Sequence, residues 1–252
     1  MLHFDNIVYG PIHSRRLGTS LGVNLLPPKG KLCNFDCIYC ECGWNRDNFS
    51  RGPFPTADDF GTAMRTALSH ISEKGIPLDS ITFSGNGEPT LNPNFPEIVD
   101  VALSLRDELA PSAKVTVFSN ATTCGKGEIF AALRKVDNPV MKIDAATSFL
   151  ADRINKPAGN YDLNRVVESL GAFEGDFIIQ TMFLRCDGFD SAAPENLTGW
   201  MDIVRKLRPR EIMAYSIDRE TPQKALHKYS SDEISSFVRP LVEEGFTVQV
   251  RG

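Results

Sequence analysis

Short runs rich in β-branched residues alternate with longer amphipathic patterns along most of this 252-residue chain, and this alternation constrains the fold more than any other feature. The runs predict strands at residues 20–26, 80–84, 114–119, 140–145, 176–184, 211–216 and 247–250. The amphipathic patterns predict helices at residues 56–74, 96–109, 127–136, 163–173, 194–207 and 232–244. Strands that alternate with helices in this way usually form a parallel sheet with right-handed crossovers.

The number of strand–helix units limits which parallel architecture is available. Six units are too few for the closed eight-stranded barrel, which typically takes about 250 residues. We therefore expect an α/β fold of the partial (β/α)6 barrel type, although the alternation alone also fits a flat, doubly wound sheet. A hydrophobic fraction of 42% supports one domain over residues 1–252. We expect an N-terminal extension at 1–19, a barrel core at 20–216 and a C-terminal helix and strand at 217–252, with an irregular loop at 43–55.

The charge and hydropathy of the chain disfavour several classes of function. No apolar run reaches the ~18 residues that a membrane span needs, and the N-terminus lacks the basic-then-apolar pattern of a secretory signal. We therefore expect a cytoplasmic protein without a membrane partner. The 27 basic and 32 acidic residues give a net charge of −5, and Arg15 and Arg16 form only a local basic pair. Binding of tRNA through an extended basic face is therefore possible but not favoured.

Four of the six cysteines fall between positions 33 and 42, and three of them have a C-x3-C-x2-C spacing: Cys33, Cys37 and Cys40. Three thiolates on a short loop can bind three irons of a cubane [4Fe–4S] cluster and leave the fourth iron open to a small molecule. The loop follows the first predicted strand, where barrel enzymes place their sites. The alternative is a zinc site with Cys42 as the fourth ligand. Zinc ribbons generally use separated C-x2-C pairs, whereas Cys40 and Cys42 are only two positions apart.

This cysteine motif, with the aromatic Tyr39 before its third cysteine, resembles the signature of the radical S-adenosylmethionine (SAM) superfamily. Residues 9–22 and 216–219 further resemble a subgroup related to wyosine-tRNA synthesis enzymes. The resemblance implies that SAM chelates the open iron through its amino and carboxylate groups. An electron from a donor such as flavodoxin or ferredoxin would then cleave SAM to methionine and a 5′-deoxyadenosyl radical. The wyosine enzymes carry further cysteines upstream of the motif, and none precedes Cys33 here, which counts against that reaction.

A glycine-containing loop follows the predicted strand at 80–84. Gly85 and Gly87 would let the backbone approach a ligand closely. With Glu88 they resemble the superfamily's glycine-glycine-glutamate motif, which holds the amino group of SAM, although Asn86 is inserted between the glycines. The resemblance also implies that Tyr39 lies near the adenine of SAM.

Polar residues near the ends of later strands are further candidates for binding SAM. The resemblance suggests that Ser119, Asn120 and Asp144 hydrogen-bond its ribose or carboxylate. Gln180 lies inside an apolar strand, and an unpaired polar group there would cost ~1–3 kcal/mol. A ligand is one possible partner for it, and internal water or neighbouring backbone is the other.

Two isolated cysteines and the arginine pair complete the candidates. Cys124 and Cys186 follow predicted strands and are candidates for an auxiliary cluster, a thiyl radical or a nucleophile, although isolated cysteines are more often inert. Arg15 and Arg16 suit an anionic substrate or the SAM carboxylate, or else a solvated surface. We expect a small-molecule or peptide substrate. The alternative from another class is a non-catalytic zinc-binding or RNA-associated module.

Overall fold

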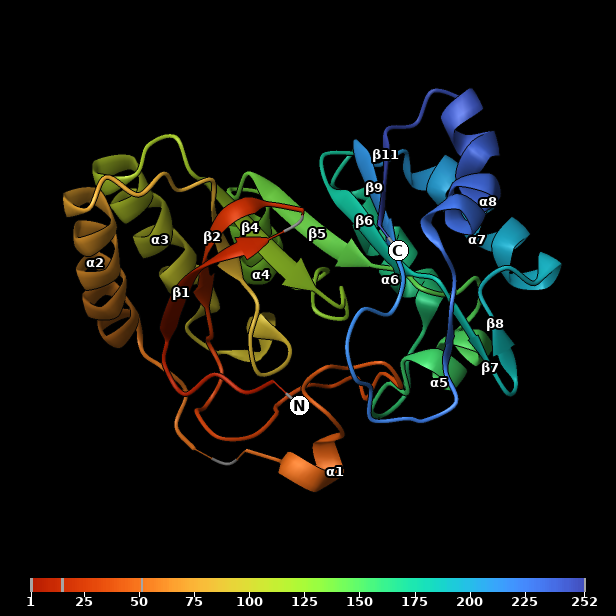
Figure 1. Ribbon diagram of the computed structural model, residues 1–252, viewed down its shortest axis with the longest axis horizontal. Helices are drawn as coiled ribbons and strands as arrows, with labels where there is room; N and C mark the ends of the chain where they lie inside the picture. Colours follow the sequence, from red (N-terminus) through yellow and green to blue (C-terminus); the bar gives the residue numbers. More distant parts are fainter. Residues whose placement is uncertain (1, 15, 51, 252) are drawn as a thin grey trace.

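The structure, a computed structural model, describes residues 2–14, 16–50 and 52–251, and one eight-stranded sheet organises them (Figure 1). The strand order is β1-β2-β3-β4-β5-β6-β9-β11. The strands are β1 (Val8–Ser14), β2 (Gly18–Val23), β3 (Ser80–Phe83), β4 (Lys114–Ser119), β5 (Asn138–Lys142), β6 (Ile178–Met182), β9 (Glu211–Tyr215) and β11 (Val248–Arg251). Neighbouring strands from β2 to β11 are parallel, as the alternation predicts, and β1 pairs antiparallel with β2.

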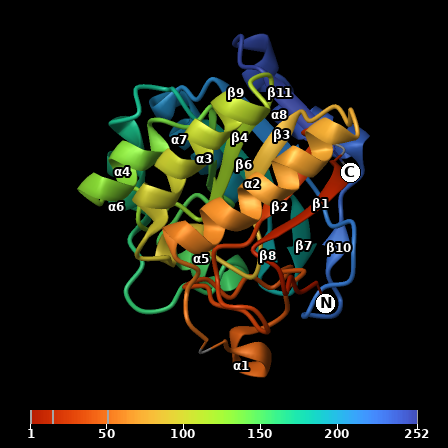
Figure 2. The ribbon, with the colours of Figure 1, turned by 90° about the vertical axis from the view of Figure 1, so that its left-hand side faces the viewer.

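Helices cover the outer face of this sheet (Figure 2). They are α2 (Ala57–Glu73), α3 (Phe95–Leu109), α4 (Gly127–Leu133), α5 (Ser148–Ile154), α6 (Leu163–Gly171), α7 (Pro194–Leu207) and α8 (Ser231–Glu243), with a short α1 (Asn45–Asn48) and a 3-10 turn η1 (Pro89–Leu91) in loops. Helix α2 shows why these segments are helical. Thr56 and Asp59 form a capping box at its start. Phe60, Met64, Leu68 and Ile71 then bury one face of the helix at three- and four-residue spacing.

The sheet curls, and a cavity shows this most directly. The cavity is lined both by Ile12 of β1 and by Arg251 of β11, which are the two edge strands of the sheet. A flat sheet of eight strands would hold its edges far apart, because neighbouring strands are about 4.8 Å apart. The expected partial barrel is therefore confirmed over the flat alternative. The described residues include no helix that is both long and apolar enough to cross a membrane.

The two faces of the curled sheet differ in polarity. Outward-facing residues such as Val115 and Val117 belong to the large core beneath the helices. The inner face carries a chain of hydroxyl groups: Ser20 Oγ lies 2.7 Å from Thr82 Oγ1, and Ser80 Oγ lies 3.1 Å from Thr116 Oγ1. These buried hydroxyls satisfy one another, as polar groups inside a barrel must.

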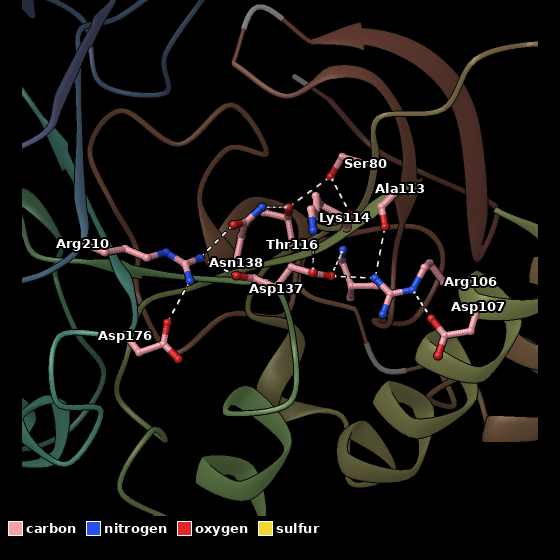
Figure 3. A network of polar contacts seen from close by, with 11 residues as sticks. Ser80, Arg106, Asp107, Ala113, Lys114, Thr116, Asp137, Asn138, Asp176 and Arg210 are labelled. Carbon is pink, nitrogen blue, oxygen red and sulfur yellow. Dashed lines mark hydrogen bonds and ion pairs between the residues drawn. The ribbon is translucent and has the colours of Figure 1, made fainter. Parts of the chain in front are cut away.

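A network of ion pairs joins the amino ends of the central strands (Figure 3). Asp137 accepts hydrogen bonds from Arg106 Nη1 at 2.7 Å and from the Val115 N–H at 2.9 Å, and Lys114 Nζ lies 3.2 Å away. Partial burial opposes ionisation, but the Val115 N–H and the Arg106 guanidinium outweigh it and lower the pKa of Asp137. The network therefore fixes α3, β4 and the start of β5 at the end of the barrel away from the cysteine loop.

The sequence pattern did not predict several strands and one helix of the structure. Residues 8–14, expected in the N-terminal extension, form β1, and its Pro11 is tolerated because edge strands need not donate every hydrogen bond. Helix α5 and a small sheet of β7 (Leu184–Cys186), β8 (Phe189–Asp190) and β10 (His227–Lys228) were also not predicted. These strands are too short for periodicity to reveal them.

Candidate active site

The cysteine loop and the glycine loop are joined by their backbones at the carboxyl ends of β2 and β3. Leu32 N–H donates to the Asn86 carbonyl at 2.8 Å, and Glu88 N–H donates to the Leu32 carbonyl at 3.1 Å. A Cβ on Gly87, whose φ is +139°, would lie 2.0 Å from Leu32 O. A Cβ on Gly85 would lie 2.5 Å from Asn24 Oδ1. The close approach that these glycines permit is therefore to the chain itself, whatever ligand also binds there.

The sulfurs of the cysteine loop receive hydrogen bonds from amide groups. Phe35 N–H donates to Cys33 Sγ at 3.4 Å, and Asn120 Nδ2 also donates to this sulfur at 3.8 Å. Asn155 Nδ2 donates to Cys37 Sγ at 3.4 Å. Burial raises the pKa of Cys37 to about 11 and raises that of Cys33 further. Donors aimed at sulfur suit thiolates that ligate a metal cluster, because they stabilise negative charge in a desolvated loop.

Cys40 and Cys42 form a hydrogen-bonded thiol pair at the edge of this loop. Cys42 lowers the pKa of Cys40 through this bond, and the nearby Lys31 ammonium lowers it further. Cys42 Sγ also lies 3.4 Å from Gly85 O, an alternative acceptor for its single proton. No three His, Cys, Asp or Glu side chains of the described residues gather closely enough to hold a single metal ion. A cubane cluster offers each thiolate a separate iron, so its ligands do not have to converge on one point.

Lys31 is a site residue that the sequence analysis missed. Its side chain is only 1% exposed, and its ammonium donates to Asp36 Oδ1 at 3.0 Å and to Gly43 O at 2.8 Å. Burial lowers the pKa of Lys31, but the neighbouring Cys40 and Cys33 and its bond to Asp36 outweigh burial and raise it. The lysine therefore remains a cation beneath the cysteines. A lone lysine in a loop sequence gives no signal of burial.

Glu88 is buried, and the chain itself occupies both of its carboxylate oxygens. Oε1 accepts from Thr90 N–H at 3.1 Å and from the Thr90 hydroxyl at 2.6 Å, while Oε2 accepts from Asn120 N–H at 2.6 Å. Asn120 in turn donates to Asn34 Oδ1 of the cysteine loop at 2.6 Å. Ser119 Oγ accepts from Ala121 N–H at 3.0 Å. These predicted residues therefore connect β3, β4 and the cysteine loop to one another.

A second polar group lies inside the barrel around Asp144. Its carboxylate accepts hydrogen bonds from the Tyr39 hydroxyl, from Asn155 Nδ2 at 2.7 Å and from the backbone of Met182 at 2.8 Å. Lys142 Nζ lies 3.9 Å from Asp144 Oδ2. Lys142 also donates to Gln180 Oε1 at 3.4 Å and lies 3.2 Å from the Tyr215 hydroxyl. The structure thus gives Gln180 a lysine side chain as its partner, which is neither the ligand nor the water or backbone that the sequence led us to expect.

A cavity of about 420 Å³ opens beside the cysteine loop, and this volume suits a bound small molecule. Among the predicted site residues, the cavity is lined by Tyr39, Cys40, Gly85 and Arg16. The other predicted residues that the structure describes are absent from its lining: Cys33, Cys37, Gly87, Glu88, Ser119, Asn120, Asp144, Gln180, Cys124 and Cys186. Arg15 lies outside the described residues.

Neither isolated cysteine lines the cavity, although Cys186 packs against the same apolar cluster as Cys33 and Cys40. Cys124 is fully buried in the core beneath the helices, and burial raises its pKa to about 12. Cys186 lies in β7, where burial raises its pKa and its sulfur is 3.6 Å from Asp187 O. A raised pKa leaves little thiolate at neutral pH, so neither thiol is activated as a nucleophile.

Comparison with known proteins identifies the class. Residues 28–178 match the family model of the radical SAM superfamily, which is more than half of the chain. The chain therefore belongs to the radical SAM superfamily, a class of enzymes. Within that class it is related to the UPF0026 proteins: one from Helicobacter pylori is 30% identical over 232 residues, which are 90% of this chain and 71% of that protein.

Solved structures of low sequence identity share the fold. SuiB from Streptococcus suis with bound S-adenosylmethionine gives a TM-score of 0.66 at 15% identity, over 88% of this chain and 49% of SuiB. SuiB bound to its precursor peptide SuiA gives 0.67 at 16% identity, over 88% and 47%. A radical SAM methyltransferase from Sphaerobacter thermophilus gives 0.67 at 17% identity, over 92% of this chain and 65% of that one. This chain spans about half the length of SuiB.

Proposed function

We propose that this radical SAM enzyme binds one [4Fe–4S] cluster through Cys33, Cys37 and Cys40 and cleaves SAM reductively beside it. The observation that carries the proposal is the cysteine loop: the desolvated sulfurs of Cys33 and Cys37 receive amide hydrogen bonds, and Cys40 of the same loop lines a ligand-sized cavity. When bound, the cluster would supply the electron that cleaves SAM to methionine and a 5′-deoxyadenosyl radical, which abstracts hydrogen from a substrate.

The residues of the chain would hold and orient these groups. Lys31 offsets the negative charge of the thiolates, because it stays protonated beneath Cys33 and Cys40. Tyr39 and Gly85 line the cavity next to Cys40, so we assign them the contacts with SAM. Tyr39 is held in place by its hydrogen bond to Asp144.

The remaining predicted SAM ligands would act as positioning residues. The oxygens of Glu88 are occupied by Thr90 and Asn120, so its role would be to hold the end of β4 against the glycine loop. Ser119 and Gln180 would likewise orient neighbouring groups, the backbone after β4 and Lys142 respectively. We assign no step to Cys124 or Cys186.

The substrate would be a small molecule or a peptide segment, with flavodoxin or ferredoxin as electron donor. SuiB binds the precursor peptide SuiA, so a protein with this fold can accept a peptide. An excess of acidic over basic residues makes tRNA a less favoured partner. All six cysteines are free thiols, which suits the reducing cytoplasm that we propose as the location.

Anaerobic reconstitution tests the proposal. The protein should hold about four irons and four sulfides, and with dithionite it should convert SAM to 5′-deoxyadenosine. Cys33→Ala, Cys37→Ala and Cys40→Ala should each abolish both properties. Cys186→Ala is the matched control, because this thiol is part-exposed and outside the cavity, and it should preserve both.

Two outcomes would contradict the proposal in different ways. Stoichiometric zinc in colourless protein, lost on Cys42→Ala, would favour the zinc-binding module. A full complement of iron without 5′-deoxyadenosine under any reductant would uphold the cluster but refute SAM cleavage.

A further inference from the structure

The turn between β1 and β2 enters the open side of the partial barrel. Leu17 packs against Val140, Ile178 and Met213, which form a small apolar cluster on the inner face of the sheet. Ser14 Oγ accepts hydrogen bonds from the Leu17 N–H at 3.2 Å and from the Arg16 N–H at 3.3 Å. These two bonds fix the conformation of the turn. A segment expected to be an extension therefore closes part of the barrel interior and forms one wall of the cavity.

Arg16, at the centre of this turn, is held between aromatic rings. Its guanidinium carbon lies 4.8 Å from the centroid of the Tyr215 ring and 5.6 Å from that of the Phe118 ring. All three side chains line the cavity. Stacking of this kind fixes the plane of a guanidinium without using its hydrogen-bond donors. The arginine is therefore oriented in advance for a partner inside the cavity.

One of the donors of Arg16 has no partner in the protein. Its Nη1 atom is buried and hydrogen-bonds to no atom of the described residues. Two other cations of the barrel interior and its rim are paired with carboxylates: Lys142 lies 3.9 Å from Asp144, and Arg219 lies 2.6 Å from Glu41. A buried donor left unpaired costs ~1–3 kcal/mol, and more when it carries charge. Such a donor persists where a ligand supplies the acceptor.

We infer that Arg16 binds an anionic group of the substrate, a carboxylate or a phosphate; this inference rests on the function proposed above. Arginine presents two parallel N–H donors that match the oxygens of either group. The cavity joins this cation to Cys40 at the cysteine loop, so one bound molecule would have its charge fixed at the turn and its reactive carbon oriented relative to SAM.

The SAM carboxylate is the other possible source of an anion, and the geometry disfavours it. Lys142 lies 5.3 Å from the Tyr39 ring and 5.7 Å from the Tyr215 ring, and thus stands between the two aromatic residues. Arg16 lies instead over the rings of Tyr215 and Phe118. A SAM molecule that chelates the cluster beside Tyr39 would also have its carboxylate engaged there. The anion at Arg16 therefore belongs to a second molecule.

Binding of inorganic phosphate by the reconstituted protein, with SAM present, tests the inference. Phosphate stands in for the anionic group, and chloride at equal ionic strength is the reference. We expect saturable binding by calorimetry and a raised melting temperature in the wild type. Arg16→Gln should weaken phosphate binding by at least about tenfold, or about 1.4 kcal/mol, and Arg16→Lys should weaken it less. Arg46→Gln is the matched control, since Arg46 also stacks on an aromatic ring, at 5.7 Å from Trp44, but lies outside the cavity.

The outcomes separate this inference from the proposed function. Failure of the wild type to bind phosphate, or equal binding by Arg16→Gln, would overturn it. If Arg16→Gln instead weakened SAM binding tenfold and left phosphate binding unchanged, the anion would be that of SAM and the substrate assignment would be wrong. Loss of the cluster or of SAM cleavage in the wild type would refute the proposed function, while the phosphate titration of the iron-free protein would still report on Arg16.

Discussion

The close approach of Gly87 to the cysteine loop predicts that even a methyl group at this position will disrupt the site. In Gly87→Ala, the new Cβ would lie 2.0 Å from the Leu32 carbonyl oxygen, a backbone atom that no side-chain rotation can move away. The residue would also keep a φ of +139°, which L side chains rarely adopt. Both effects act on the junction between the glycine loop and the cysteine loop.

The expected magnitude has two parts. The backbone conformation costs a non-glycine residue about 1–3 kcal/mol. Relief of the clash requires Leu32 to shift, which strains its hydrogen bonds with Asn86 at 2.8 Å and Glu88 at 3.1 Å, worth about 1 kcal/mol each. We therefore expect Gly87→Ala to lower the free energy of unfolding by about 3–5 kcal/mol in total.

Urea unfolding of the iron-free protein measures this loss, and two other glycines serve as controls. Gly75 has a φ of +61° and no neighbour within 4 Å of a Cβ, so Gly75→Ala should show the conformational cost without the clash. Gly127, in the first turn of α4, has neither constraint, and its alanine variant should be neutral or slightly stabilising. If Gly87→Ala were no less stable than Gly75→Ala, the packing explanation would be refuted. If Gly87→Ala impaired SAM binding without lowering stability, the glycine would instead serve to make room for a ligand, as the sequence suggests.

Two further predictions concern buried charges. Asp137→Ala removes the acceptor for Arg106 and the Val115 N–H and should cost about 1–3 kcal/mol at neutral pH. Because the folded protein lowers the pKa of Asp137, its contribution is complete above the unfolded value of ~3.9 and is lost as pH falls through the lower folded pKa. The urea curves of the two proteins should therefore converge in acid, and a gap that stayed constant to the lowest pH would contradict this. Lys31→Met leaves Asp36 and the thiolates without their cation. Because Asp36 is 25% exposed, we expect the free energy of unfolding to fall by roughly 1–3 kcal/mol, which is less than for a fully buried pair. Iron retention during gel filtration should fall with it, and unchanged retention would show that this charge does not matter.

The elements that could be predicted from sequence are those whose signal is local. Hydrophobic periodicity located the central strands and most helices, because burial of one face repeats every two or 3.6 residues. The C-x3-C-x2-C spacing likewise placed the cysteine loop, since three ligands on one short loop need no distant residue to bring them together. Strand β1 was not predicted, because Gly10 and Pro11 interrupt the alternation of its residues.

Most of the candidate site depends on contacts between distant segments. Asp144 and Glu88 are suitably polar, yet their oxygens are occupied by Tyr39, Asn155, Thr90 and Asn120, and no spacing along the chain reveals those partners. A sequence shows which groups must find a hydrogen bond but does not show whether a ligand or the protein supplies it.

The sequence by itself thus determined the class of fold and the position of the cysteine loop, because both follow from neighbours a few residues apart. Only the tertiary structure decided that the sheet curls until β1 and β11 border one cavity. It also decided that Lys31 is buried as a cation and that Arg16 lies between Phe118 and Tyr215. Burial and charge pairing depend on which surfaces pack together, and packing is a property of the whole chain.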